Sequence, residues 1–168
     1  MNVTLHTTQR EHSRTLGNLI QLYCYDFSEL IDVEMSEEGI FASPSLDAYW
    51  TDEWRHAFLI RVDATLAGFA LVHERSKLTG ASGIFDMAEF FVLRKFRRRG
   101  VGGLAAFAAF DKFRGDWEVR ERSANANATA FWRRAIGSYT GGNFKEVVWN
   151  DATWQGPVQY FSSLAAPR

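Results

Sequence analysis

The segment from Arg97 to Gly102, Arg-Arg-Arg-Gly-Val-Gly, limits the fold of this 168-residue chain more than any other. It lies three residues after the largely apolar run from Ala88 to Leu93 and precedes a helical stretch from Leu104 to Phe113. A strand that ends in a glycine-containing turn and continues as a helix presents unpaired backbone N–H groups at the positive end of the helix dipole. We therefore predict a phosphate site at this turn and a phosphorylated cofactor as its ligand.

Hydrophobic periodicity predicts the remaining elements. Apolar residues recur at steps of three and four from Glu11 to Leu30, which indicates an amphipathic helix, and a weaker helix is expected from Ser45 to Trp54. A further helix is expected over 125–135, and strands are expected over 57–62, 66–73, 84–93, 117–121, 144–149 and 158–162. This order predicts a single α/β domain with one mixed central sheet flanked by helices.

Composition limits the classes of partner. The net charge of −1 gives no overall field that would favour nucleic acid or an anionic membrane, and no apolar run approaches the length of a membrane span. The basic run from Arg94 to Arg99 lies beside the predicted turn, so we assign it to cofactor phosphates, with a nucleic-acid contact as the remoter alternative. A lone cysteine, Cys24, and the lack of an apolar leader favour the cytoplasm and leave no thiol cluster for a metal.

The turn resembles the acetyl-CoA-binding segment of the GNAT family of N-acyltransferases. That family has Arg or Gln, two residues, Gly, one residue, and Gly or Ala after a strand that ends in Val. Here Arg97, Gly100 and Gly102 take the pattern positions, and Val92 takes the strand position.

A second segment, from Asn125 to Trp132, is similar to the family pattern Asn-x-x-Ala-x-x-hydrophobic-Tyr. Asn125 and Ala128 have the expected spacing, whereas Trp132 stands where the family usually has Tyr. The resemblance covers most of the chain, although its specific motifs occupy only residues 90–137.

This resemblance implies the GNAT fold and an N-acetyltransferase that passes the acetyl group of acetyl-CoA to a primary amine by direct attack. It divides the domain, 1–168, into a helical acceptor-side region over 1–55, a cofactor-binding core over 56–137 and C-terminal strands over 138–168. The amine belongs to a small molecule or a protein, and dimers are common in the family, so a homodimer stays open. The alternative function is a non-catalytic CoA-binding sensor or partner-binding protein.

The resemblance also assigns the cofactor residues. The second half of the strand, from Phe91 to Leu93, pairs with the pantetheine arm, and a backbone N–H near Val92 polarises the thioester carbonyl. Pyrophosphate lies on the amides from Arg98 to Gly103, where glycines permit close approach. The full predicted set is Phe91, Val92, Leu93, Arg97, Arg98, Arg99, Gly100, Val101, Gly102, Gly103, Asn125, Ala128 and Trp132.

Acyl transfer to an amine needs a general base, and Glu89 is the best candidate. It is an acid inside an apolar strand, where burial raises the pKa toward the working pH. A structural ion pair between Glu89 and an arginine is an equally good interpretation. Asp86 and His73 are weaker candidates.

The proton for the leaving thiolate has no obvious donor, because the indole of Trp132 cannot supply one. Tyr139 is the first candidate, and protonation by solvent is the alternative.

Acceptor recognition is assigned to the first two helices by resemblance. Tyr25 and Asp26 interrupt the apolar stripe there. An aromatic wall with a carboxylate, suited to an amine cation, is expected from Tyr23, Tyr25, Asp26, Tyr49, Trp50 and Trp54. For any one of these rings, a place in the core is the simpler interpretation. The acceptor itself is not fixed by a fold.

Overall fold

A computed structural model describes residues 1–165 of the chain. It has seven strands: β1 (Val3–Thr7), β2 (Arg55–Val62), β3 (Thr65–Arg75), β4 (Ser82–Val92), β5 (Asp116–Arg120), β6 (Lys145–Asn150) and β7 (Gln155–Ser162). It has four α-helices: α1 (Ser13–Phe27), α2 (Ala48–Thr51), α3 (Val101–Lys112) and α4 (Ala126–Thr140). Two 3₁₀ segments, Arg10–His12 and Arg94–Phe96, precede α1 and the turn before α3.

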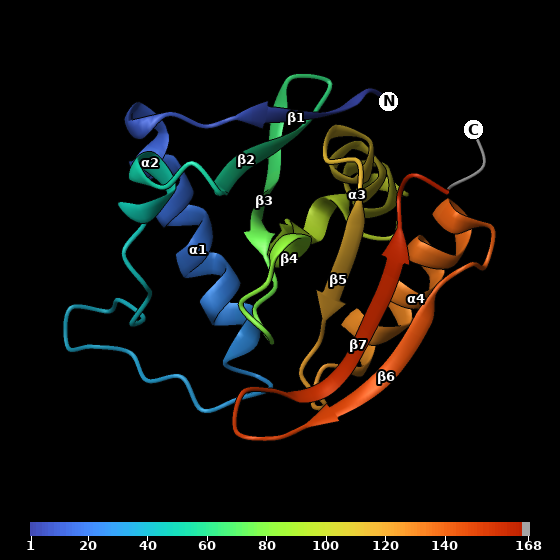
Figure 1. Cartoon of the computed structure of the whole chain (residues 1–168). Coiled ribbons are helices and arrows are strands. Elements are labelled where there is room, and N and C mark those ends of the chain that lie inside the picture. Colours follow the sequence, from blue (N-terminus) through green and yellow to red (C-terminus); the bar gives the residue numbers. More distant parts are fainter. Residues whose placement is uncertain (166–168) are drawn as a thin grey trace.

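The strands form one sheet in the order β1-β2-β3-β4-β5-β7-β6 (Figure 1). Only β4 and β5 are parallel, and every other neighbouring pair is antiparallel. The predicted mixed sheet with flanking helices is therefore confirmed. The parallel pair joins through α3, so the turn before α3 lies at the end of β4.

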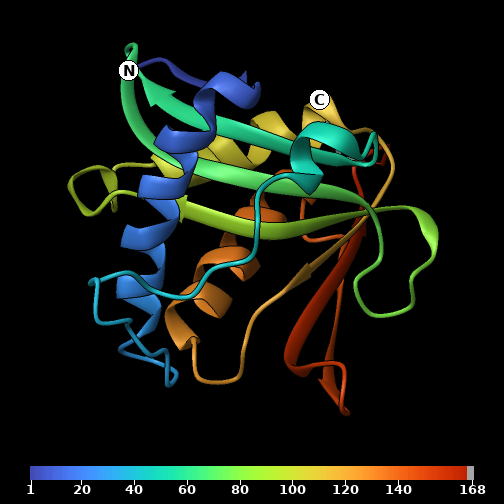
Figure 2. The ribbon, with the colours of Figure 1, turned by 90° about the vertical axis from the view of Figure 1, so that its left-hand side faces the viewer.

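Helices cover both faces of the sheet. Figure 2 shows α1 in front of the strands, with α3 and α4 behind them. On the α1 face, Leu16 packs with Phe69 and Phe91, so the stripe predicted from the sequence does face the sheet. On the other face, α3 and α4 pack over a larger aromatic core that includes Phe110 and Trp117. A glutamate side chain on β4 and a tyrosine side chain on α4 can therefore lie on opposite faces of the sheet.

Three elements differ from the prediction. Residues 3–7 form β1 within the region expected to be helical, and Val3 pairs with Val62 of β2; five residues are too short a pattern to separate a strand from a loop. The second helix is shorter than expected, because Asp52 is extended and ends α2. α4 is longer than expected and runs on to Gly141, whose φ of +64° ends it.

The second half of β4 separates from β5. The parallel pairing covers only Ile84 to Asp86, although β4 continues to Val92. On the other edge the register with β3 slips after Leu71, which leaves Ala88 as an extra residue in a β-bulge. The edge of β4 beyond Asp86 is therefore open on the β5 side.

Within the described part of the chain, no helix has the length and apolar character needed to cross a membrane.

Candidate active site

The turn before α3 has backbone geometry suited to an anion. Gly100 lies in the left-handed region with φ of +80°, and Arg98 lies there too with φ of +59°. The first helical hydrogen bond runs from the N–H of Leu104 to the carbonyl of Gly100. The N–H groups of the three intervening residues have no helical acceptor, and no side chain among residues 1–165 caps them. These N–H groups are the ones predicted to receive a phosphate.

The two glycines inside α3 have different roles. No atom lies within 4 Å of a Cβ built on Gly103, so a ligand can approach the backbone there. A Cβ on Gly102 would lie 3.0 Å from the ring of Phe131 on α4. Gly102 therefore serves the packing of α3 against α4, and Gly103 keeps the ligand side open.

The arginines of the turn fall into two groups. Arg94 and Arg97 both bind the carboxylate of Asp26 on α1, and Nε of Arg97 also donates to the Val92 carbonyl at 2.7 Å. Partial burial opposes ionisation of Asp26, but the hydrogen bonds from the two arginines outweigh it and lower the pKa of Asp26. Within residues 1–165, the two arginines after Arg97 are exposed and have no carboxylate at ion-pair distance. Asp26 was predicted to bind the acceptor, but its carboxylate binds two arginines of the turn.

The open edge of β4 presents backbone groups of its own. The N–H of Leu93 donates to the carbonyl of Ala67 at 2.8 Å, so Leu93 faces β3. Successive residues of a strand face opposite edges, so Phe90 and Val92 direct their N–H and C=O groups away from β3. The Val92 carbonyl already accepts the hydrogen bond from Nε of Arg97. The Val92 N–H, the group predicted to polarise the thioester carbonyl, thus faces the open edge of β4.

Glu89 forms a pair with Tyr23 on the α1 face of the sheet. The Tyr23 hydroxyl donates to Oε2 of Glu89. Burial raises the pKa of Glu89, and the hydrogen bond from Tyr23 partly opposes this rise. Burial and the neighbouring carboxylate also raise the pKa of Tyr23. Glu89 is therefore hydrogen-bonded to a tyrosine, and its contact partner is not the arginine of the alternative interpretation.

The two weaker base candidates belong to a separate polar chain on the same face. Nε2 of His73 lies 2.8 Å from the hydroxyl of Tyr49, and Nδ1 of His73 lies 3.8 Å from Oδ2 of Asp86. Arg120 of β5 donates to both oxygens of Asp86, at 2.9 and 2.8 Å. Burial lowers the pKa of His73 to about 4 and raises that of Asp86 to about 6. Each group already has a partner.

The second predicted motif lies at the start of α4. Asn125 precedes the helix, and its Oδ1 accepts a hydrogen bond from the N–H of Ala128 at 3.0 Å, which is the usual capping contact. Trp132 is 5% exposed, and its ring centroid lies 5.1 Å from that of Phe90. The spacing from Asn125 to Trp132 therefore places a cap at the helix start and an aromatic ring against β4.

The structure does not bring Tyr139 to Glu89. The Tyr139 hydroxyl donates to Oδ1 of Asp111 at 2.7 Å and accepts from Arg114 at 3.1 Å. Burial and the contact with Asp111 raise the pKa of Tyr139 to about 12. Its ring packs in the aromatic core under α3 and α4, whereas Glu89 contacts α1 on the opposite face.

The predicted acceptor residues are divided by the fold. Tyr25 is 61% exposed at the surface of α1, and Trp50 is half-buried against the core beneath α1. Asp26 follows Tyr25 in the sequence, and its carboxylate binds the turn arginines. The three residues do not form one wall around a free carboxylate.

Sequence reasoning gave Arg120 no role, and it placed Tyr23 and Tyr49 only in the aromatic wall expected around the acceptor. The stripe of α1 did not indicate that the Tyr23 hydroxyl contacts Glu89. Arg120 gave no signal either, because it alternates with Asp116 and Glu118 along β5, a pattern typical of a polar face of a strand.

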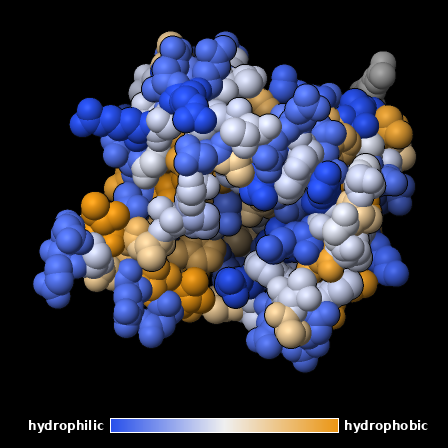
Figure 3. Space-filling model, turned by 60° about the vertical axis from the view of Figure 1, so that its left-hand side comes forward, coloured by the Kyte–Doolittle hydropathy of each residue, from blue (hydrophilic) through white to orange (hydrophobic). Residues whose placement is uncertain are grey.

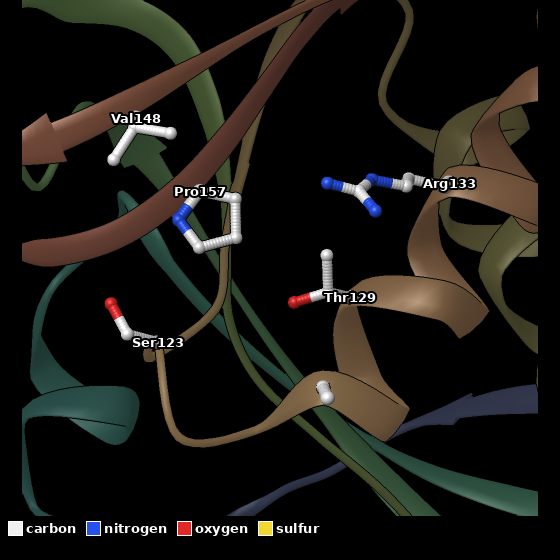
Figure 4. Close-up of a pocket in the computed structure, with 6 residues that line it drawn as sticks. Ser123, Thr129, Arg133, Val148 and Pro157 are labelled. Carbon is white, nitrogen blue, oxygen red and sulfur yellow. The ribbon is translucent and has the colours of Figure 1, made fainter.

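Two hollows mark the surface. Figure 3 shows one near the centre of the α1 side, with hydrophobic surface to its lower left and hydrophilic surface to its right. The other is a cavity of about 310 Å³ lined by Ser123, Ala126, Thr129, Arg133, Val148 and Pro157. In Figure 4, Arg133 extends from α4 across this cavity toward β7. None of the predicted site residues lines it.

Comparison with known proteins gives a consistent picture. The model of the acetyltransferase (GNAT) family matches residues 19–137, a span that contains the turn, β4 and most of α4. None of the curated proteins compared matches the sequence. An acetyltransferase from Thermus thermophilus has a similar structure, with a TM-score of 0.68 and 16% identity over 96% of this chain and 97% of that chain.

Two further similar structures were solved with coenzyme A. One is the PaiA N-acetyltransferase of Thermoplasma acidophilum, with a TM-score of 0.62 and 11% identity over 96% of this chain and 99% of that chain. The other is spermidine N-acetyltransferase of Vibrio cholerae, which also holds spermine, with a TM-score of 0.61 and 13% identity over 96% of this chain and 95% of that chain. At these identities the likeness concerns the fold alone.

Proposed function

Since this chain belongs to the acetyltransferase (GNAT) family and is therefore an acyltransferase, we propose that it transfers the acetyl group of acetyl-CoA to a primary amine by direct attack. The observation that carries the proposal is the position of β4. One strand holds the open edge at Val92, carries Glu89 on its α1 face, and leads into the turn with unpaired N–H groups. A ligand with a pyrophosphate and an extended arm fits this arrangement.

The residues at the turn and on β4 divide the binding of acetyl-CoA between them. The N–H groups at the start of α3 receive the pyrophosphate, with Arg98 and Arg99 as nearby cations. The Val92 N–H receives a carbonyl of the extended portion. When bound, acetyl-CoA supplies an acyl group activated as a thioester. The left-handed Gly100 and the open space beside Gly103 fit such a ligand.

Glu89 accepts the amine proton. As the amine nitrogen forms its bond to the acyl carbon and the C–S bond breaks, the ammonium proton passes to the Glu89 carboxylate, and burial makes this carboxylate a stronger base than an exposed one. Solvent protonates the departing thiolate, because the Tyr139 hydroxyl is bound to Asp111 on the other face of the sheet. A thiol has a pKa low enough for this route.

Calorimetry on the purified chain, freed of any bound cofactor, tests the proposal. We expect saturable one-to-one binding of acetyl-CoA and of CoA, followed by release of free thiol when acetyl-CoA and a reactive amine are present together. No binding by the folded chain would overturn the cofactor site. Tight binding without thiol release, for every class of amine, would favour the alternative of a non-catalytic CoA-binding protein.

A further inference from the structure

Two tryptophans on the acceptor side of the sheet each lie between two arginines. The Trp54 ring has the guanidinium of Arg55 at 4.3 Å and that of Arg75 at 4.6 Å from its centroid. The Trp154 ring, on the segment between β6 and β7, has Arg120 at 4.6 Å and Arg122 at 5.1 Å. Stacking on an aromatic face holds a guanidinium in one orientation and leaves its N–H groups free to bind.

Both stacks border the polar chain beside Glu89. The Trp54 ring contacts His73 at 5.3 Å between centroids. Arg120, in the other stack, is the residue that binds Asp86. The stacks therefore flank the group of side chains around Glu89, on the face of the sheet that carries α1.

The arginines of the two stacks differ in their ion pairs. Arg55 binds Asp52 at 3.1 Å, and Arg120 binds Asp86. Among the residues that the structure describes, Arg75 and Arg122 have no carboxylate at ion-pair distance.

Three acids of this face already have partners. Glu118 accepts hydrogen bonds from the Ser76 hydroxyl and the Lys77 N–H, and Asp26 binds the turn arginines. Glu89 accepts the Tyr23 hydroxyl. Among the described residues, Arg75 and Arg122 are left without an anionic partner.

The electrostatics of the buried groups agree with this inventory. Burial is the largest cause of the low pKa of His73, and every further cause is a nearby cation, Arg55 and Lys77 among them. Burial raises the pKa of Glu89, and Arg122 is one of the charges that lower it. Arg122 therefore influences the pKa of Glu89, the carboxyl that we propose accepts the amine proton.

We propose that the amine acceptor carries an oxyanion, a carboxylate or a phosphate, which the Arg122 guanidinium binds while the amine faces Glu89. The inference rests on the proposed function and names the acceptor class of that same site. A guanidinium offers two parallel N–H donors to such a group. A polyamine, by contrast, would bring a second cation toward Arg122.

Matched pairs of amines test the inference. The panel contains tyrosine and tyramine, ornithine and putrescine, phosphoethanolamine and ethanolamine, with spermidine as the polycation. We expect kcat/KM, measured by thiol release, to be at least tenfold higher for the anionic member of a pair that reacts. Ornithine and phosphoethanolamine distinguish a carboxylate from a phosphate. Faster reaction of spermidine, or of the members of the pairs that lack a carboxylate or phosphate, would overturn the acceptor inference. The acetyltransferase proposal would still stand.

The variant Arg122→Gln tests whether Arg122 causes the preference for anionic amines. We expect it to lower kcat/KM for the anionic amines by about 10- to 100-fold more than for their partners, mainly through KM. Arg122→Lys should recover part of the loss. Arg134→Gln, which removes an exposed cation from α4, is the matched control and should change neither value. An equal loss for both members of each pair would overturn the role of Arg122, and failure of acetyl-CoA binding in the wild-type chain would instead overturn the proposed function.

Discussion

The hydroxyl of Tyr23, on α1, donates a hydrogen bond to Oε2 of Glu89, on β4. The residues are 66 positions apart and meet because α1 packs across β3 and β4. The bond stabilises the Glu89 carboxylate, while burial of the same group favours its protonated form. The packing of α1 therefore adjusts the strength of the proposed base.

Glu89→Gln tests that base. We expect kcat to fall by about 10²- to 10⁴-fold, since an amide cannot accept the amine proton. Because burial raises the pKa of Glu89, wild-type activity should rise with pH as this carboxyl loses its proton, and the variant should lose that limb. Stopped-time thiol assays across pH measure both effects. Unchanged turnover with an unchanged pH profile would remove Glu89 from the mechanism.

Tyr23→Phe keeps the Glu89 carboxyl in place but changes its strength as a base. Loss of the donor removes an influence that lowers the pKa of Glu89, so this pKa should rise further. The acidic limb of the kcat/KM profile should then move to higher pH, while the activity on the plateau is retained. Acetyl-CoA affinity, measured on the same preparation, shows whether the site is intact. A limb that stays in place, or moves to lower pH, contradicts the assignment of the limb to Glu89.

Gly103→Asp tests the turn without backbone strain. A Cβ on Gly103 meets no atom within 4 Å, so the chain should fold normally. The new carboxylate lies among the N–H groups that we assign to pyrophosphate, and we expect the Kd of acetyl-CoA to rise about 10- to 100-fold. Gly17→Asp is the matched control, because Gly17 is also helical and open. Equal affinities of the two variants would place the pyrophosphate elsewhere.

Local patterns predicted most of the fold. The stripe of α1, the strand before Arg97 and the helix after Gly100 are each fixed by periodicity or by a backbone requirement within a few residues, and the structure has all three. β1 could not be predicted in this way, because its place depends on pairing with β2, more than fifty positions later.

The candidate site was less accessible to sequence reasoning. Glu89 could be singled out because a charge in an apolar strand has few explanations. Its partner Tyr23 could not, since a tyrosine at core spacing gives the same pattern whether its hydroxyl binds a carboxylate or water. Asp26 likewise broke the stripe of α1, but only the folded chain shows that it faces Arg94 and Arg97.

Gly68→Ala should destabilise the chain and disturb the site together. A Cβ at this position of β3 would lie 1.9 Å from the carbonyl oxygen of Phe91 on β4. Neither backbone can move without breaking the ladder, so we expect a loss of about 3 kcal/mol or more in the free energy of unfolding. In contrast, Gly17→Ala should stabilise α1 by about 0.5 to 1 kcal/mol. Urea denaturation compares them, and similar midpoints for both variants would contradict the close contact.

Glu121→Gln should make the chain less sensitive to alkaline pH. Glu121 is 3% exposed, and Gln159 donates to its Oε2 at 3.1 Å, while its Oε1 has no partner among the described residues. Burial raises the pKa of Glu121 from 4.5 to about 8. The folded chain therefore holds a proton that the unfolded chain releases between these values, and this contribution to stability is lost as the pH rises through 8.

The amide in Glu121→Gln has the shape of the protonated acid and cannot ionise. We expect the variant and the wild type to unfold at similar temperatures near pH 5, and the variant to be the more stable at pH 9, by on the order of 3 kcal/mol. Glu146→Gln is a control of opposite sign, because its hydrogen bond with Arg133 lowers the pKa of Glu146. That variant should be less stable than the wild type at neutral pH and approach it in acid. Parallel stability curves for Glu121→Gln and the wild type would mean that Glu121 ionises freely in the folded chain.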